Sequence, residues 1–295
     1  MKPSKGNSKR AVKKTEGHYM KCSLVADIMF VAPGEHGPVW PDEKGLCEAM
    51  DLAKSNGLSA IEIFDFEGRN LELLAAEARK RNMEIISFCQ KNGKFWGDPA
   101  HLDEFVQGFR DSVESAKTLG ASNVVVSDDF YPTELPREEI HAAMVEGLKR
   151  LAPLAEQAGL TVIAEPLSGK YFRDAKEPFD IIREVNSPNI KLLYDIFHFQ
   201  LIAGNITKTL RENIDLIGHI HGAGAPDRGD LTESELDYSY ILEQLSKTGY
   251  DRYFGLEFFT FENRNEKVWK SANLACRNRE LRQQLAEYFA QHRNS

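Results

Sequence analysis

The stretch IKLLYDIFHFQLIAGNITKTLRENIDLIGHIHGA, residues 190–223, places two short apolar runs on either side of a helical segment. The runs, 190–198 and 216–223, are continuously apolar rather than alternating, which is typical of parallel strands buried on both faces. Two such strands joined by a helix form a βαβ unit. This stretch therefore predicts a parallel sheet.

The same alternation extends along the chain in both directions. Helical segments lie between the runs, and glycines such as Gly57 and Gly120 follow them as stop signals. The longest helical segment, residues 136–159, contains Pro153, which predicts a kink or a helix boundary near Leu151. The other strand-like runs are residues 22–30, 60–66, 83–88, 123–127, 160–167 and 253–259.

Eight strand–helix units indicate closure into a single (β/α)8 TIM barrel. An open doubly wound sheet is the alternative, but no glycine-rich phosphate loop follows the first strand. No linker interrupts the body of the chain. We therefore expect one barrel domain over residues 21–295, preceded by a flexible basic leader at residues 1–20.

Charge and hydropathy exclude several classes of function. Residues 1–20 carry six Lys and Arg against one Glu, a net charge of +5. Because the whole chain has a net charge of −8, the remaining residues carry −13. An acidic body argues against nucleic-acid binding, which needs clustered basic residues. No apolar run is long enough for a membrane span, and the leader lacks the apolar segment of a secretory signal.

The four cysteines, Cys22, Cys47, Cys89 and Cys276, are dispersed and include no CxxC pair. Cys22 and Cys89 lie in apolar strand-like runs, where cysteine usually behaves as a small hydrophobic residue. Nothing in the spacing requires a disulfide. A reducing cytoplasm is therefore the expected compartment.

Polar residues interrupt the last four apolar runs near their carboxyl ends. These residues are Glu165 in VIAEP, Asp195 in LLYDIFH, His221 in GHIHGAG and Glu257 in GLEFF. In a (β/α)8 barrel the carboxyl ends of the strands meet at one mouth, which carries the active site. A buried carboxylate is costly unless it is paired or bound to a metal.

We therefore predict that these four residues bind one divalent metal ion. Carboxylate oxygens with a single imidazole suit Mn²⁺ or Mg²⁺, and Zn²⁺ or Co²⁺ is possible. The alternative is that the four side chains form salt bridges and caps at the barrel rim.

Other residues near the predicted mouth are candidates for substrate binding. They are His198, Arg228 on the loop after the seventh strand, and Glu62 within AIEIFDF, which is alternatively a structural rim partner. His219 lies two residues before His221 and points to the same face, so we expect it to support the site. Asp128, at a strand end, is interpreted as a loop-initiating residue.

The motifs VIAEP, YDIFHFQ, GHIHGAGAPDRGD and GYDRYFGLEF together resemble the hydroxypyruvate isomerase family, within the xylose isomerase-like barrel superfamily that also holds ketose 3-epimerases. The resemblance runs from about Cys22 to Phe259. It implies an intramolecular oxidoreductase of the aldose–ketose type, with Glu165 and Glu257 as catalytic acid and base and with Asp195 and His221 completing the metal set. It also implies a homodimer or homotetramer.

In that family a metal polarises a carbonyl and the adjacent hydroxyl, one glutamate removes a proton to give an enediolate, and the other returns a proton. The reaction expected here converts hydroxypyruvate to tartronate semialdehyde. One residue departs from the pattern: hydroxypyruvate isomerases tend to carry Gln where this chain has His221, whereas the 3-epimerases carry His.

Three alternatives stay open at this point. The chain is alternatively a ketose 3-epimerase or a 2-oxo-tetronate isomerase, which use related chemistry. A non-catalytic sugar-binding barrel is the alternative from another class. An endonuclease IV-like phosphodiesterase is disfavoured, because it needs histidine ligands on the early strands and a basic groove for DNA.

Overall fold

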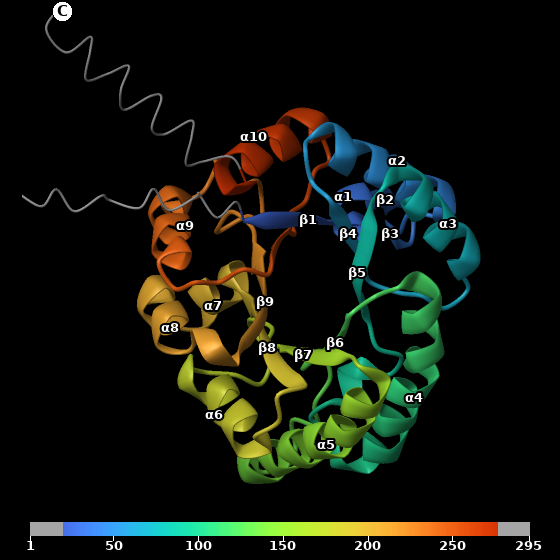
Figure 1. Cartoon of the computed structure of the whole chain (residues 1–295). Coiled ribbons are helices and arrows are strands. Elements are labelled where there is room, and N and C mark those ends of the chain that lie inside the picture. Colours follow the sequence, from blue (N-terminus) through green and yellow to red (C-terminus); the bar gives the residue numbers. More distant parts are fainter. Residues whose placement is uncertain (1–19, 277–295) are drawn as a thin grey trace, which may run out of the picture.

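The computed structural model describes residues 20–276, and these residues form a closed barrel of parallel strands ringed by helices (Figure 1). The strands follow the order β1-β10-β9-β8-β7-β6-β5-β4 around the barrel, so the predicted (β/α)8 fold is confirmed. Their bounds are β1 Lys21–Val25, β4 Ala60–Ile63, β5 Glu84–Cys89, β6 Asn123–Ser127, β7 Thr161–Glu165, β8 Ile190–Asp195, β9 Ile217–Gly222 and β10 Tyr253–Leu256.

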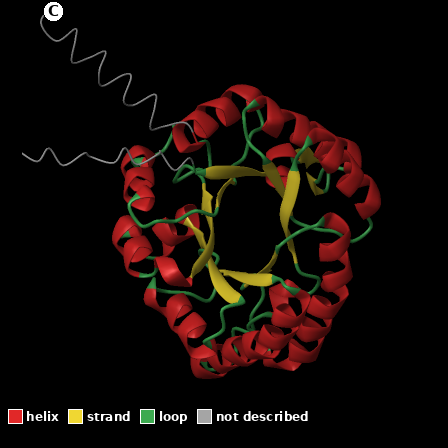
Figure 2. Cartoon of the chain, viewed as in Figure 1, coloured by secondary structure: helices red, strands yellow, loops and turns green. Residues whose placement is uncertain are grey.

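Helices cover the outside of the barrel on all sides in Figure 2. Several begin and end at the residues that the sequence marks: the Asp42 side chain accepts a hydrogen bond from the Gly45 N–H, and Gly120 ends a helix with a positive φ of 75°. The helices are α1 Ala26–Phe30, α2 Glu43–Ser55, α3 Leu71–Arg81, α4 Leu102–Leu119, α5 Arg137–Ala158, α6 Lys176–Val185, α7 Ile196–Ile202, α8 Ile206–Glu212, α9 Tyr238–Ser246 and α10 Arg264–Cys276.

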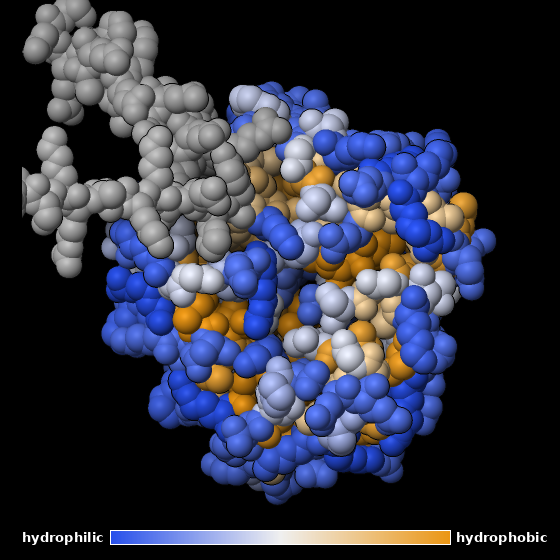
Figure 3. Space-filling view, viewed as in Figure 1, coloured by the Kyte–Doolittle hydropathy of each residue, from blue (hydrophilic) through white to orange (hydrophobic). Residues whose placement is uncertain are grey.

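The barrel core consists of apolar side chains between the strands and the surrounding helices. A smaller cluster of Val125, Ile163 and Leu193 is separate from this main core and comes from the neighbouring strands β6, β7 and β8. On the face shown in Figure 3, hydrophilic residues dominate the periphery and hydrophobic residues gather nearer the centre. No helix of residues 20–276 is long and apolar enough to cross a membrane.

Several local features of the structure differ from the sequence-based expectations. The first apolar run does not continue as a strand, because β1 ends at Val25 and α1 begins at once. A two-stranded hairpin, β2 Ala32–Gly34 with β3 Gly37–Val39, follows α1 and was not predicted. Helix α5 continues through Pro153, so of the two predicted alternatives the boundary near Leu151 is wrong. Proline removes one backbone hydrogen bond and crowds the preceding turn, but it does not end this 22-residue helix.

The expectation that no disulfide is needed also differs from the structure. Cys22 at the start of β1 is bonded to Cys276 at the end of α10, 254 residues away in the sequence. The bond joins the first strand to the last described helix, whereas Cys47 and Cys89 are free thiols. The predicted leader, except Met20, and the chain after Cys276 lie outside the described residues.

Candidate active site

The four predicted metal ligands lie together at one end of the barrel. Glu165, Asp195 and His221 lie at or next to the carboxyl ends of β7, β8 and β9, and Glu257 directly follows β10. Asp195 pairs with His221 in the strand register, so these two side chains emerge at one level of the barrel. Adjacent parallel strands thus deliver four polar side chains to one place.

These four residues are buried, and their ligand atoms all lie within 4.8 Å of one another. His221 Nδ1 is 3.0 Å from Glu257 Oε2 and 3.9 Å from Glu165 Oε1. The three carboxylates in so small a volume repel one another unless positive charge compensates them. The donor set is one that hard or borderline divalent cations prefer.

Two buried oxygens in the cluster are unsatisfied. Within residues 20–276, Glu165 Oε1 and Asp195 Oδ2 have no hydrogen-bond partner. A buried polar atom without a partner costs free energy, and more when it is charged. A cation between the four side chains removes that cost, so the residues present fit a divalent metal ion.

Glu62 fixes the orientation of the His221 ring from the side opposite the other three cluster residues. His221 Nε2 is 3.1 Å from Glu62 Oε2, which leaves Nδ1 facing the three carboxylates. A metal-binding histidine commonly donates its other N–H to a carboxylate, which fixes the tautomer and strengthens the ligand. Gly255 makes the approach possible, because a Cβ there would lie 2.5 Å from Glu62 Oε1 and 2.6 Å from His221 Cδ2.

Glu62 is itself surrounded by donors. The hydroxyls of Ser23 and Ser87 each lie 2.6 Å from it, and His219 Nε2 lies 2.9 Å from it. Burial opposes ionisation, but the two histidines hold the pKa of Glu62 well below its usual range. Its two oxygens are engaged by four donors, so the structure supports Glu62 as a partner of His221 rather than as a substrate contact.

His198 presents a free donor to the cluster. It lies in α7, and its Nδ1 accepts a hydrogen bond from the Ser168 N–H at 3.1 Å. Burial lowers the pKa of His198, so the neutral ring carries its proton on Nε2. Nε2 has no hydrogen-bond partner within residues 20–276 and lies 3.5 Å from Asp195 Oδ2. A substrate oxygen at this point would accept the Nε2–H.

Arg228 brings positive charge to the same cluster. Its Nη2 lies 2.8 Å from Glu257 Oε2 and 3.5 Å from Asp195 Oδ2, and its guanidinium lies over the Phe197 ring. Arg228 has a positive φ of 53°, a conformation that non-glycine residues adopt infrequently. The structure therefore places two of the three predicted substrate-binding residues, His198 and Arg228, against the proposed metal ligands.

The two glutamates have different electrostatic surroundings. Burial and the nearby Glu257 carboxylate hold the pKa of Glu165 well above its usual range. Burial also acts on Glu257, but Arg228 and His221 outweigh it and hold the pKa of Glu257 below its usual range. Burial raises the pKa of Asp195. Of the three carboxylates in the cluster, Glu257 is therefore the one whose ionised form the surrounding side chains favour most.

Sequence reasoning missed several residues that support or line the site. Asp128, interpreted from the sequence as a loop-initiating residue, is buried and accepts hydrogen bonds from the Leu167 N–H at 2.7 Å and the Tyr171 N–H at 2.9 Å. It thereby holds the loop that carries Ser168, and burial raises its pKa to about 6. The wall of the small cavity at the cluster includes apolar residues such as Cys89 and Val125.

Comparison with known proteins agrees with this geometry. Residues 50–278 match the family model described as xylose isomerase-like TIM barrel. A 2-oxo-tetronate isomerase of Cupriavidus necator is 31% identical over 229 residues, which cover 74% of this chain and 88% of that protein. The hydroxypyruvate isomerase of Escherichia coli is 27% identical over 165 residues, covering 54% of this chain and 64% of that protein.

Among solved structures, an L-ribulose 3-epimerase aligns with a TM-score of 0.72 at 18% identity, covering 94% of this chain and 98% of the other. At that identity the likeness shows the fold alone. The family model covers most of the barrel and includes all four residues of the buried cluster. The chain belongs to the xylose isomerase-like TIM barrel family.

The support that Glu62 gives to His221 is testable by substitution. Glu62→Gln retains the volume but removes the charge that orients and strengthens the imidazole. We expect Mn²⁺ affinity, measured by calorimetric titration, to fall about 10-fold to 100-fold. Glu146→Gln, at an exposed position on α5, is the matched control and should bind Mn²⁺ like the wild type. A folded Glu62→Gln protein with unaltered affinity would show that His221 needs no such partner.

Proposed function

We propose that the chain is an isomerase of small sugars or keto acids, which moves a proton between adjacent carbons of a hydroxy-carbonyl compound. One observation carries the proposal: Glu165 and Glu257 come from different strands, and their oxygens converge on a buried volume within 4.8 Å of Asp195 and His221. Proton transfer between adjacent carbons needs one group that removes the proton and one that returns a proton, and two carboxyl groups at one reacting centre can serve as this base and acid.

The residues of the chain have separable roles in this reaction. The Nε2–H of His198 donates to a substrate oxygen, and Arg228 binds a substrate carboxylate or hydroxyl. Of Glu165 and Glu257, one removes the proton from the carbon next to the carbonyl to give an enediolate. The other delivers a proton to the former carbonyl carbon, while the hydroxyl proton passes to the former carbonyl oxygen and the hydroxyl oxygen becomes the new carbonyl. The roles exchange in the reverse direction.

A divalent ion held by Glu165, Asp195, His221 and Glu257 would act as a Lewis acid on the carbonyl and the adjacent hydroxyl. We propose Mn²⁺ or Mg²⁺, because three of the four donors are carboxylates, with Zn²⁺ or Co²⁺ as alternatives. We also propose a homodimer or homotetramer, on the basis of the family resemblance.

A small keto acid is the substrate class that the site favours. The cavity at the cluster is small, and Arg228 lies beside it as a guanidinium that suits a carboxylate. The relatives named as 2-oxo-tetronate and hydroxypyruvate isomerases support the same class. We propose hydroxypyruvate to tartronate semialdehyde as the reaction, with 2-oxo-tetronate isomerisation and ketose 3-epimerisation as alternatives. His221 supports the epimerase alternative.

Removal of the metal tests the proposal that a divalent ion is bound and required for turnover. Exhaustive chelation should abolish turnover and lower the melting temperature, because an ion that binds only the native state stabilises it, by about 4 kcal/mol at a thousandfold excess over its Kd. Turnover and scanning calorimetry measure the two effects, and restoration by added Mn²⁺ is the control. Full activity and an unchanged melting curve in verified metal-free protein would contradict the assignment.

Substitution of each glutamate tests the proton transfer. Glu165→Gln and Glu257→Gln retain volume and lose the titratable group, so each should lower turnover by about 10² or more. Glu146→Gln again serves as the control for an uninvolved glutamate. If either variant turns over at nearly the wild-type rate when saturated with metal, that residue does not carry a proton.

A further inference from the structure

A second cavity lies at the end of the barrel opposite the proposed active site. It has a volume of about 390 Å³, and its lining includes Lys21, Asn123, Thr161 and Tyr253, the first residues of β1, β6, β7 and β10. The proposed metal ligands lie instead at the carboxyl ends of the strands. This cavity, which we call the amino-end cavity, therefore has no part in the proposed isomerase chemistry.

Positive charge predominates in the amino-end cavity. Lys21 and Arg252 line it together with one carboxylate, that of Asp251. Neither Lys21 nor Arg252 forms a salt bridge to any of residues 20–276; Lys21 Nζ lies over the Tyr253 ring, and Arg252 Nη1 donates to the Ile217 carbonyl at 2.7 Å. Two uncompensated cations on an otherwise acidic protein favour an anionic ligand.

The floor of the amino-end cavity is a buried histidine. His219 is 1% exposed, and its Nε2 is held by Glu62 at 2.9 Å. No partner for its other nitrogen, Nδ1, occurs in the described part of the chain. Because Glu62 holds Nε2, Nδ1 is the ring nitrogen that remains for a ligand. A ligand hydroxyl can hydrogen-bond to it, since a hydroxyl both donates and accepts.

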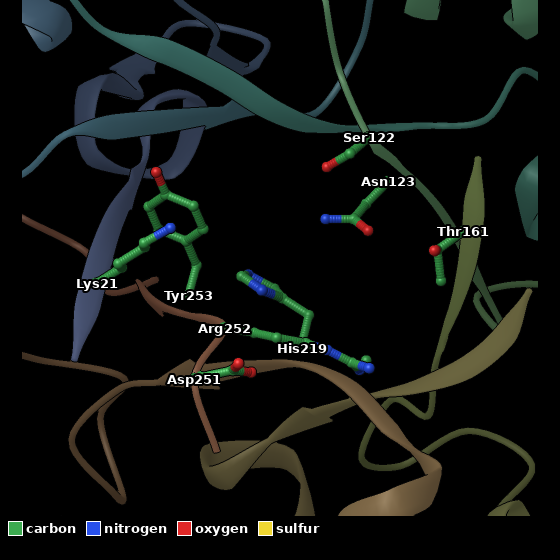
Figure 4. Close-up of a pocket in the computed structure, with 9 residues that line it drawn as sticks. Lys21, Ser122, Asn123, Thr161, His219, Asp251, Arg252 and Tyr253 are labelled. Carbon is green, nitrogen blue, oxygen red and sulfur yellow. The ribbon is translucent and has the colours of Figure 1, made fainter. Parts of the chain in front are cut away.

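Neutral hydrogen-bonding groups complete the lining. Figure 4 shows Lys21 and Tyr253 on one side of the cavity and Ser122, Asn123 and Thr161 on the other, with the His219 ring between them. Hydroxyl and amide groups in this arrangement can donate to an oxyanion and accept from hydroxyls. Asp251 adds a further acceptor for hydroxyls.

We propose that the amino-end cavity binds a small oxyanion that also carries hydroxyl groups. The oxyanion lies near Lys21 and Arg252, and the hydroxyls bind to His219 Nδ1 and to the Asp251 carboxylate. A hydroxy acid and a phosphorylated polyol share this chemistry. The proposal goes beyond the isomerase function and does not depend on it, because it uses none of the four residues of the catalytic cluster.

Calorimetric titration of the full-length protein with D-glycerate and with glycerol 3-phosphate tests the proposal. Both titrations use Glu257→Gln protein in a chelating buffer, so that they do not depend on the catalytic metal or on turnover. Tighter binding of one probe than of the other identifies the carboxylate or the phosphate as the preferred oxyanion. The proposal is overturned if neither probe binds at millimolar concentration.

Variants assign the binding to the amino-end cavity. In that background, Lys21→Met should weaken binding about 10-fold or more by removing one cation, and Ser122→Phe should abolish it by filling the cavity without changing any charge. Lys149→Met, at an exposed position on α5, changes the net charge equally and should leave the affinity unaltered. Binding that survives both cavity variants lies elsewhere and refutes the assignment. If Ser122→Phe does not fold, the comparison of binding affinity between Lys21→Met and Lys149→Met decides whether the ligand binds in the amino-end cavity.

Discussion

The burial of three carboxylates within one end of the barrel is the constraint on which the site depends. Glu165, Asp195 and Glu257 have ligand atoms within 4.8 Å of one another, and each is nearly inaccessible to solvent. Like charges at such distances in a low-dielectric interior raise one another's pKa or require a cation. The protein supplies part of that compensation through Arg228, and a divalent ion fits the part that remains.

Much of the supporting structure follows from the need to hold His221 in place. A neutral imidazole binds a metal through one nitrogen, so the other must be fixed by a hydrogen bond. Glu62 provides that bond, Ser23, Ser87 and His219 hold Glu62, and Gly255 leaves the space in which they meet. The layer beneath the proposed metal site is therefore a polar network, centred on Glu62, within a largely apolar barrel.

The barrel and the four converging residues were predictable from the sequence, because the carboxyl ends of parallel strands meet at one mouth. The role of Glu62 was not, since it depends on contacts with β1, β5 and β9 that no local pattern encodes. The free donor of His198 depends on Ser168, 30 residues earlier. The Cys22–Cys276 bond likewise depends on how β1 and α10 pack together.

Exchange of substrate hydrogen with solvent tests the central claim most directly. Purified protein with Mn²⁺ is incubated in D₂O with hydroxypyruvate, 2-oxo-tetronate or a ketose, and proton NMR follows each carbon-bound hydrogen. The account predicts deuterium uptake at the carbon next to the carbonyl of one of these compounds, and loss of that uptake in Glu165→Gln and Glu257→Gln protein. Binding of the same compounds without any exchange would contradict it and would indicate a sugar-binding barrel without catalysis.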